Sequence, residues 1–353
     1  MKSNPDFTEL QRTHGIYFDG AMGGAMDYVD MRFAANYVLA NDAQPGLITT
    51  MNNGIPAFLS NYIDPKVITV LTTPNNGAKL LGEVQKGDWV TRTMTFPMVE
   101  STGETSAYGD WNNNGSVSAN VDFPQRQSFH YQTITQWGQK QLAEAALAKI
   151  DWSQRLNIAS AMVLDKFQNN SYFYGIGGLQ NYGMLTDPQL PAAITPVTKA
   201  AGGTTWAVAT PNELYADFQK LFNQLTTQTN GLITQDTKLV FATTPGAMMW
   251  LSSANSFGVT PQDLLRKGFP NIRFETAPQY GIGPTGAPNG AGTVVQLFAE
   301  EIDGQETGYC AFTEKMRAHP IVADVSSYKQ KKSQGTWGAI IFLPVAFAQM
   351  VGV

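Results

Sequence analysis

The sequence has few of the residues that metal sites and disulfides require. It contains one cysteine, Cys310, so an intrachain disulfide is excluded and the cytoplasm is the simplest site of folding. Its three histidines are His14, His130 and His319, and none has metal-ligand spacing to another or to Cys310. Zinc normally takes three or four protein ligands. We therefore expect no metal site and no cofactor.

Charged residues are also scarce, at 14% of the chain, although the hydrophobic fraction of 43% is that of an ordinary globular protein. Asn, Gln, Thr, Ser and Gly take the place of the missing charge. A surface of this kind hydrogen-bonds to neighbours without the cost of desolvating ions. The composition is typical of a subunit that covers much of its surface with copies of itself, but secreted sugar-binding β proteins share it.

The formal net charge of −5 argues against a tight nucleic-acid binder. The clustered basic residues Lys329, Lys331 and Lys332 are interpreted as the solvated end of a strand. Residues 1–19 contain no signal peptide pattern. The longest apolar run, 339–348, is too short to span a bilayer and contains Pro344, so we expect a buried strand and no membrane partner.

The 353 residues are long enough for about two domains. Glycines interrupt residues 1–45, which are predicted to form an extended arm with a short helix near 28–39, and a strand is expected over 67–71. Trp89–Glu100 and Val117–Phe123 alternate in strand fashion around the polar segment 102–115. This pattern predicts a long two-stranded hairpin. A lone hairpin is marginally stable in water, so we expect another chain to cover it.

Helical periodicity predicts a helix from Trp137 to Leu147 and a second one starting at Asp151, with Gln154 placed for a capping box. The stripe Leu156, Ala159, Val163 and Phe167 is expected to face the core, and the glycines from Gly175 to end the helix. Residues 204–320 alternate helices and strands. The expected elements are helices 211–229, 245–254 and 261–267, strands 238–242, 272–276 and 293–299, and a final β region 326–353 with a turn at Gly335.

Candidate catalytic and ligand sites each have a simpler structural explanation. Gly20–Gly24 and Gly175–Gly178 lack the context of a phosphate-binding loop. Glu300, Glu301 and Asp303 resemble a glycosidase pair but are better explained as a solvated turn. The aromatic residues Trp89, Tyr108, Trp111 and Tyr131 are more typical of packing or interface groups than of a sugar platform. We expect no enzymatic activity.

The order of these parts, together with several short stretches, resembles the major capsid proteins of tailed bacteriophages, which have the Hong Kong 97-like α+β fold. The matching stretches are Asn52–Ala57, Asn61–Pro65, Tyr108–Asp110, Phe123–Gln127, Gln168–Gly175 and Tyr182–Pro188. Met184 and Thr186 stand where the family more usually has Leu and Asn, and no motif for Lys–Asn crosslinking is found. The resemblance implies an N-terminal arm (1–45), a first part of the peripheral domain (46–83), an extended β-hairpin loop (84–130), the peripheral domain with its spine helix (131–204), an α/β axial domain (205–320) and the final peripheral strands (321–353).

The resemblance implies a structural virion protein that self-assembles through hexamers and pentamers into an icosahedral shell around double-stranded DNA, without reading its sequence. It also implies assembly in the host bacterial cytoplasm, a separate scaffolding protein, a portal and a cement protein. Aromatic residues dominate interface hot spots, so we predict intersubunit contacts by Trp89, Phe96, Tyr108 and Trp111 of the hairpin loop. Two alternatives stay open. One is a nanocompartment shell of the same fold, and the other is a carbohydrate-binding or carbohydrate-active β protein.

Overall fold

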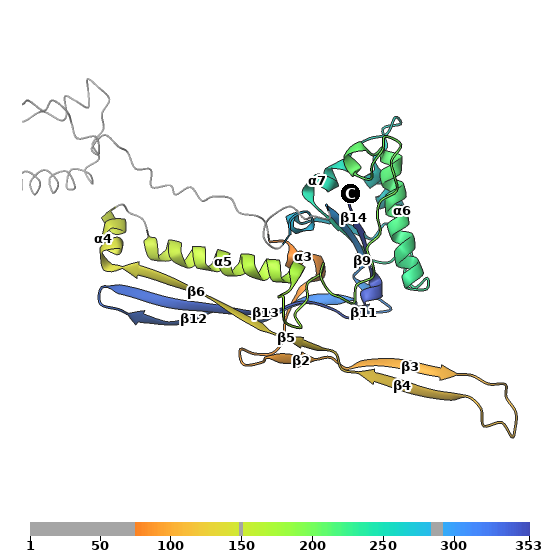
Figure 1. Ribbon diagram of the computed structural model, residues 1–353, viewed down its shortest axis with the longest axis horizontal. Helices are drawn as coiled ribbons and strands as arrows, with labels where there is room; N and C mark the ends of the chain where they lie inside the picture. The colour runs from red at the N-terminus through yellow and green to blue at the C-terminus, as the bar shows by residue number, and fades with distance from the viewer. Residues whose placement is uncertain (1–74, 148–150, 284–291) are drawn as a thin grey trace, which may run out of the picture. The chain divides into compact units, whose positions relative to one another are not determined.

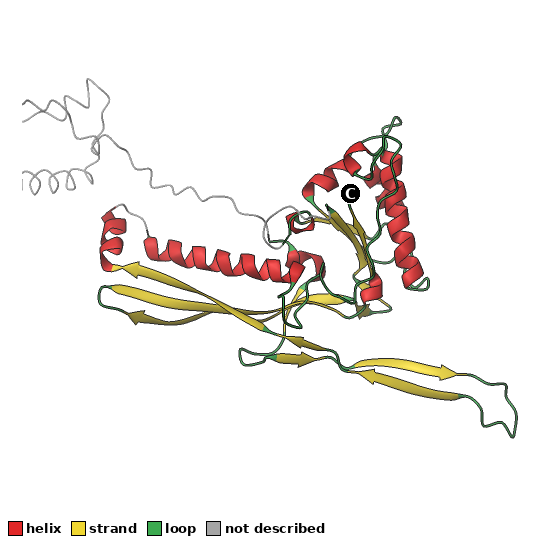
Figure 2. Ribbon diagram, viewed as in Figure 1, coloured by secondary structure: helices red, strands yellow, loops and turns green. Residues whose placement is uncertain are grey.

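The computed structural model describes residues 75–147, 151–283 and 292–353. These residues form two four-stranded sheets with helices against them, and three two-stranded pairs (Figures 1 and 2). We call β1-β12-β13-β6 the long sheet and β14-β9-β7-β8 the short sheet. The mixture of helices and strands confirms the predicted α+β class. The predicted arm, the helix near 28–39 and the strand 67–71 lie outside the described residues.

The long sheet is built on two long antiparallel strands, β12 (Gly308–Ala323) and β13 (Ser327–Ile341). Strand β6 (Phe129–Gly138) pairs with the other edge of β13, and β1 (Glu83–Gln85) runs parallel to β12. Gly335 lies inside β13 opposite His130, so the predicted turn there is wrong. A Cβ at this position would lie 2.0 Å from Thr313 Oγ1, and close packing therefore explains the glycine.

Helices α4 (Gln139–Leu147) and α5 (Trp152–Tyr174) follow β6. Asp151 caps α5 as predicted, with its Oδ1 accepting the Gln154 backbone N–H at 3.0 Å. Gly175 ends α5 in the left-handed region at φ 63°, confirming the predicted stop. The first helix was predicted to begin at Trp137, but that residue belongs to β6 and pairs with Tyr328.

Helix α5 contacts the long sheet through apolar side chains such as Phe167, which packs on Tyr131, and through a row of buried polar side chains. Ser160 Oγ lies 2.7 Å from Lys332 Nζ, and Ser171 Oγ lies 2.8 Å from Thr336 Oγ1. The Gln334 side-chain amide donates to Oε1 of the Gln168 side chain. All of these side chains are buried. We call the set the polar belt; its members are Ser160, Gln168 and Ser171 of α5 and Lys332, Gln334 and Thr336 of β13.

The polar belt overturns two expectations. The apolar stripe of α5 was expected to face the core, but Val163 is 60% exposed and Phe167 37% exposed. Lys332, expected to be solvated, is 2% exposed and donates to Asn157 as well as to Ser160. Its burial lowers the pKa of Lys332 from the ordinary lysine value.

The short sheet contains the main apolar core of the described residues. Parallel strands β7 (Leu239–Thr243) and β8 (Ile272–Thr276) lie beside antiparallel β9 (Val294–Ala299) and β14 (Phe347–Val351). The predicted helix α6 buries Leu214, Phe218, Leu221 and Leu225, and its Phe222 is partly buried. The helices of this region are α6 (Pro211–Gln228), α7 (Pro245–Trp250) and α8 (Pro261–Gly268).

Sheet membership does not follow the predicted division between residues 320 and 321. Most of β12 falls before the division yet pairs in the long sheet, while β14 falls after it yet pairs with β9 of the short sheet. The segment boundaries themselves stay predictions. The remaining short elements are α3 (Gly77–Leu81), β2 (Thr93–Thr95), β3 (Met98–Glu104), β4 (Ser116–Asp122), β5 (Gln125–Gln127), η2 (Trp206–Val208), η3 (Pro278–Tyr280), β10 (Glu301–Ile302), β11 (Gln305–Glu306) and η4 (Pro344–Ala346).

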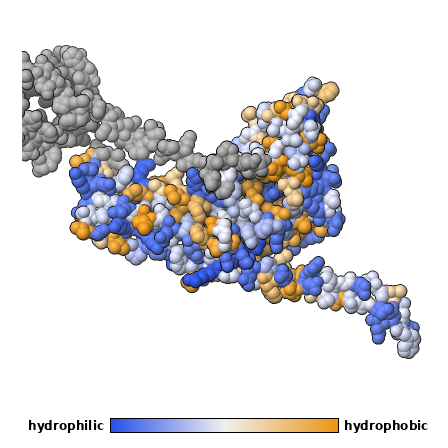
Figure 3. Space-filling model, in the orientation of Figure 1, coloured by the Kyte–Doolittle hydropathy of each residue, from blue (hydrophilic) through white to orange (hydrophobic). Residues whose placement is uncertain are grey.

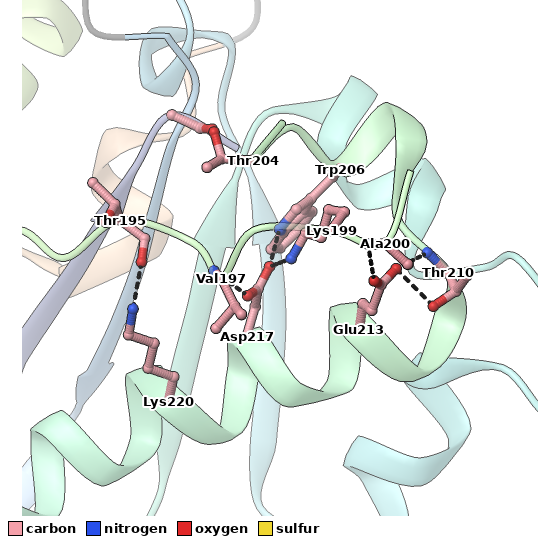
Figure 4. Close-up of polar contacts among 11 residues, drawn as sticks. Thr195, Val197, Lys199, Ala200, Thr204, Trp206, Thr210, Glu213, Asp217 and Lys220 are labelled. Carbon is pink, nitrogen blue, oxygen red and sulfur yellow. Dashed lines mark hydrogen bonds and ion pairs between the residues drawn. The ribbon is translucent and has the colours of Figure 1, made fainter. Parts of the chain in front are cut away.

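A buried carboxylate attaches the segment before α6 to that helix (Figure 4). Asp217 is fully buried and accepts the Val197 backbone N–H and the Trp206 indole N–H, each at 3.0 Å. The ammonium of Lys199, whose side chain is 1% exposed, donates to the same carboxylate. At the start of α6, Glu213 accepts the backbone N–H groups of Ala200 and Thr210. These hydrogen bonds fix residues 197–210 against the helix.

Candidate interaction surface

The hairpin β3–β4 is the most exposed regular structure among the described residues. Its register pairs Met98 with Asp122 at one end and Glu104 with Ser116 at the other. From Met98 to Phe123 every residue is exposed except Thr102, which is half-buried. The predicted hairpin is therefore confirmed, and the described part of the chain covers neither of its faces.

The two faces of the hairpin differ in polarity because directly paired residues of antiparallel strands point to the same side. One face carries Val99 opposite Val121 and Val117 opposite Gly103. Val99, Val117 and Val121 are 66%, 83% and 53% exposed. Figure 3 shows apolar surface where the hairpin leaves β2 and β5 and mostly pale or hydrophilic surface toward its tip. Such an apolar face favours contact with another surface.

The charges of the hairpin are all of one sign. Residues 98–123 contain four acidic side chains and no lysine or arginine, a formal net charge of −4. A partner surface that supplies basic groups or hydrogen-bond donors matches this charge. The acidic residues are Glu100, Glu104, Asp110 and Asp122.

The tip of the hairpin, residues 105–115, presents two aromatic rings to solvent. Tyr108 is 94% exposed and Trp111 98% exposed. Hydrogen bonds within the loop hold its shape: Tyr108 OH donates to Asp110 Oδ1 at 2.9 Å, and Asn112 Nδ2 donates to the Ala107 carbonyl at 2.7 Å. The tip therefore presents its aromatic and acidic groups in an ordered loop, which reduces the entropy cost of binding.

The other two predicted contact residues lie nearer the long sheet and pack within the chain. Trp89 makes an edge contact with His130, with ring centroids 4.7 Å apart, and the Arg317 guanidinium lies 5.1 Å from its ring centre. Burial lowers the pKa of His130, while Glu314 opposes that effect. Phe96 makes an edge contact with Phe342 at 5.6 Å. Of the four predicted residues, the structure thus exposes Tyr108 and Trp111 and gives Trp89 and Phe96 partners in their own chain.

A pocket of about 330 Å³ lies at the base of the hairpin, where the chain leaves β4. Arg126 is 6% exposed there, pairs with the buried Asp187 at 3.2 Å, and lies 4.9 Å from the ring centre of Tyr182. The Arg126 Nε has no hydrogen-bond partner in the described structure. We call this the base pocket; its lining residues are Phe123, Gln125, Arg126, Gln180, Tyr182, Pro188 and Gln189.

Arg126 and Asp187 were not among the site residues predicted from the sequence. Both lie in stretches that carry the family resemblance, 123–127 and 182–188, and these stretches meet at the base pocket. Nothing in the sequence pairs two residues 61 positions apart, so the salt bridge between them appears only in the fold.

The other candidates do not come together. Glu300 pairs with Arg273 at 2.7 Å and Glu301 with Lys238 at 2.8 Å, while Asp303 occupies the predicted turn at φ 51°. Tyr131 packs on Phe167 of α5, away from the exposed tip residues. No three His, Cys, Asp or Glu side chains in the described ranges are grouped to hold a metal ion. In the same ranges, no helix has the length and apolar character needed to cross a membrane.

Comparison with known proteins gives one family. A family model described as Pa193 gp26 major capsid protein matches residues 46–352. A search of curated proteins gives no match.

Solved structures with a similar fold are also capsid proteins. The capsid of Myoviridae Phage XM1 is similar with a TM-score of 0.69 and 12% identity, over 85% of this chain and 99% of that one. The capsid of the cyanophage P-SCSP1u gives a TM-score of 0.57 and 11% identity, over 87% and 97%. The capsid of the native GTA particle gives 0.56 and 10%, over 86% and 99%. These similarities confirm the predicted Hong Kong 97-like fold.

Proposed function

The chain belongs to the Pa193 gp26 major capsid protein family and is a structural capsid subunit, and from this premise we propose that it self-assembles through hexamers and pentamers into an icosahedral shell around double-stranded DNA. The exposed hairpin is the observation that supports this function best. Its apolar face and aromatic tip have no cover among the described residues, and a two-stranded hairpin gains stability from contact with further surface. A neighbouring copy supplies that surface in a shell.

Repeated weak contacts are sufficient for such a shell. Each subunit engages several neighbours at once, so the contacts reinforce one another through their effective concentration. Tyr108 and Trp111, both almost fully exposed, are the side chains that we assign to intersubunit contact. Trp89 and Phe96 act indirectly, since their packing against His130 and Phe342 fixes the direction in which the hairpin leaves the sheet.

The remaining partners belong to the same proposal. Assembly takes place in the host bacterial cytoplasm with a separate scaffolding protein, a portal and a cement protein. The DNA is held as contents without sequence reading, which agrees with the net charge of −5. No catalytic step is assigned to the chain.

Microscopy of negatively stained protein tests the proposal. The full chain, purified over a range of concentrations and also co-expressed with the scaffolding protein of its own phage, is expected to form uniform closed shells. A variant lacking residues 100–116 is expected to remain unassembled. A second variant, Asn113→Ala, changes an exposed tip residue outside the aromatic pair and is expected to assemble like the wild type.

Two results would contradict the proposal. If the full chain stays monomeric even with its scaffolding protein, it is not a shell subunit, and a carbohydrate screen becomes the appropriate next test. If shells purified from infected cells enclose a protein cargo and no DNA, the nanocompartment alternative is correct.

A further inference from the structure

We propose that residues 66–74 bind along the outer apolar face of helix α5 in their own chain, with Leu71 against Ile158 and Met162. Residues 66–74 lie outside the described residues, whereas the surface that they would cover is described. The contact lies within one copy, so it goes beyond the proposed function and requires no shell.

Helix α5 has apolar side chains that the described residues leave uncovered. Ile158 and Met162 are four positions apart and are therefore neighbours on the helix surface, where they are 44% and 46% exposed. Val163, next to Met162, is 60% exposed. Covering apolar surface of this kind is favourable in water.

A pocket of about 300 Å³ continues this surface toward β12. Met162 forms one side of it and Met316 of β12, which is 43% exposed, forms another. The volume is at the lower end of the range of ligand pockets, roughly 300–1,000 Å³, and suits a side chain of a chain segment. The lining residues are Ala161, Met162, Asp165, Lys315, Met316 and Gln334. We call the surface formed by Ile158, Met162, Val163 and Met316 the α5 face.

The first described range of the chain begins at the edge of the α5 face. Its first residue is Asn75, whose Nδ2 donates to Asp165 Oδ2 at 2.6 Å. The Gly77 backbone N–H donates to Asn169 Oδ1 at 2.8 Å, which holds the start of α3 against α5 (Figure 1). Asp165 also lines the pocket. The residues that precede Asn75 therefore start beside the α5 face.

The segment that precedes Asn75 has the composition to cover the α5 face. Residues 66–74 contain one charged side chain and four aliphatic ones. The aliphatic residues are Val67, Ile68, Val70 and Leu71. Such a segment gains more from an apolar surface than from water.

The segment is also long enough to reach the whole α5 face. Leu71 is four positions before Asn75, a reach of roughly 13 Å at about 3.3 Å per residue. Ile158 is seven positions before Asp165, which is about 10 Å along a helix that rises 1.5 Å per residue. Leu71 can therefore contact Ile158 and Met162 while Asn75 keeps its hydrogen bond to Asp165.

A segment of the same chain has an advantage over any separate partner. Its connection at Asn75 gives it a high effective concentration at the α5 face. A second copy or another protein would lose translational and rotational freedom on binding there. The chain's own segment is therefore the occupant that we assign to this surface.

Photocrosslinking of the full chain, kept unassembled at low concentration, tests the contact. With benzoylphenylalanine in place of Leu71, mass spectrometry is expected to find attachment within 155–166 or at 315–316, in a product of monomer mass. The control carries benzoylphenylalanine in place of Asn113, an exposed residue of the hairpin tip, and is expected to give no attachment to these segments. Attachment of the Leu71 variant to other segments, attachment no stronger than in the control, or products of dimer mass linked at α5 would overturn the inference.

Urea unfolding of single and double variants gives a second measurement. Met162→Gln keeps a similar helix preference and removes the apolar end of the side chain, and Leu71→Gln changes its proposed partner. Each is expected to lower the urea midpoint, and the double variant is expected to lower it by less than the sum because the two residues share one contact. Leu232, which is 58% exposed and lies away from α5 in sequence, serves as the control, since the shifts of Leu232→Gln and Leu71→Gln are expected to add. Additive shifts for Leu71 and Met162 would contradict the contact.

Microscopy of the same variants under assembly conditions reports shell formation separately. Shells formed by a chain whose Leu71 attaches away from α5 refute the contact and leave the proposed function standing. A chain that shows the contact but forms no shells with its scaffolding protein does the reverse.

Discussion

The buried ion pair at α6 provides the sharpest stability test in the chain. Replacing Asp217 with Asn keeps an acceptor for only one of the Val197 backbone N–H and the Trp206 indole N–H, which bind different carboxylate oxygens, and leaves the Lys199 ammonium without an opposite charge. Both charged side chains are nearly inaccessible, at 0% and 1% exposure. Removing one partner of a buried pair costs about 3–5 kcal/mol. We expect Asp217→Asn to lower the free energy of unfolding by about that amount.

The double variant separates the charge interaction from the packing. Lys199→Met alone is expected to lower the free energy of unfolding by about 3 kcal/mol because it leaves a buried carboxylate without its partner. Lys199→Met combined with Asp217→Asn removes both charges. The double variant is therefore expected to lose at least about 2 kcal/mol less than the sum of the two single variants. Urea unfolding of the unassembled chain, followed by circular dichroism, measures the three values.

The exposed pair Lys238–Glu301 serves as the control for this experiment. Its side chains are 59% and 47% exposed, and the coupling measured with Lys238→Met and Glu301→Gln is expected to stay below about 1 kcal/mol. If the effects of the Lys199 and Asp217 variants add within about 0.5 kcal/mol, burial adds nothing to this interaction and the prediction is wrong.

Three further predictions concern the hairpin and the titration of single groups. Trp111→Ala is expected to change the free energy of unfolding by less than about 0.5 kcal/mol and to abolish the shells seen by microscopy. Phe96→Ala removes the contact with Phe342 and is expected to lower the free energy of unfolding by about 2 kcal/mol, measured with urea. The backbone N–H groups of Thr210 and Ala200 lower the pKa of Glu213 to about 2, so its stabilising effect is present above pH 4.5 and lost as the pH falls toward 2. Glu213→Gln should remove that part of the acid dependence of the urea midpoint. The prediction is wrong if the wild type and the variant lose stability equally as the pH falls. Desolvation lowers the pKa of Lys332 in the folded chain, so between its folded and unfolded pKa values the unfolded chain binds more protons and stability rises with pH. From pH 7 toward pH 10, the urea midpoint of the wild type should therefore rise relative to that of Lys332→Met. A difference in midpoint that does not change with pH would contradict this prediction.

The sequence predicted α6 well because its apolar stripe is buried in its own chain. Leu214, Phe218, Leu221 and Leu225 repeat at helical spacing and all lie in the core of the short sheet. The same reasoning gave the wrong inward face for α5. Periodicity identifies which face of a helix is apolar, but it does not say whether the surface that covers it belongs to the same chain. The inward face of α5 combines the polar belt with buried Leu164, Tyr172 and Phe173.

The candidate site was predicted in outline. Alternation around a polar tip was sufficient to locate the hairpin and its exposed rings, Tyr108 and Trp111. It could not show that Trp89 and Phe96 have intrachain partners, because His130 and Phe342 lie 41 and 246 positions away along the chain. Contacts over such separations depend on the register of the sheet, which local sequence does not determine.

The polar belt also gives the two sheets different responses to temperature. Exposure of apolar surface raises the heat capacity on unfolding, whereas exposure of polar surface lowers it. The apolar core of the short sheet therefore loses part of its driving force as the protein is cooled. The contact between α5 and the long sheet combines side-chain hydrogen bonds with apolar packing of Phe167, Tyr172 and Phe173, so it shares this loss only in part.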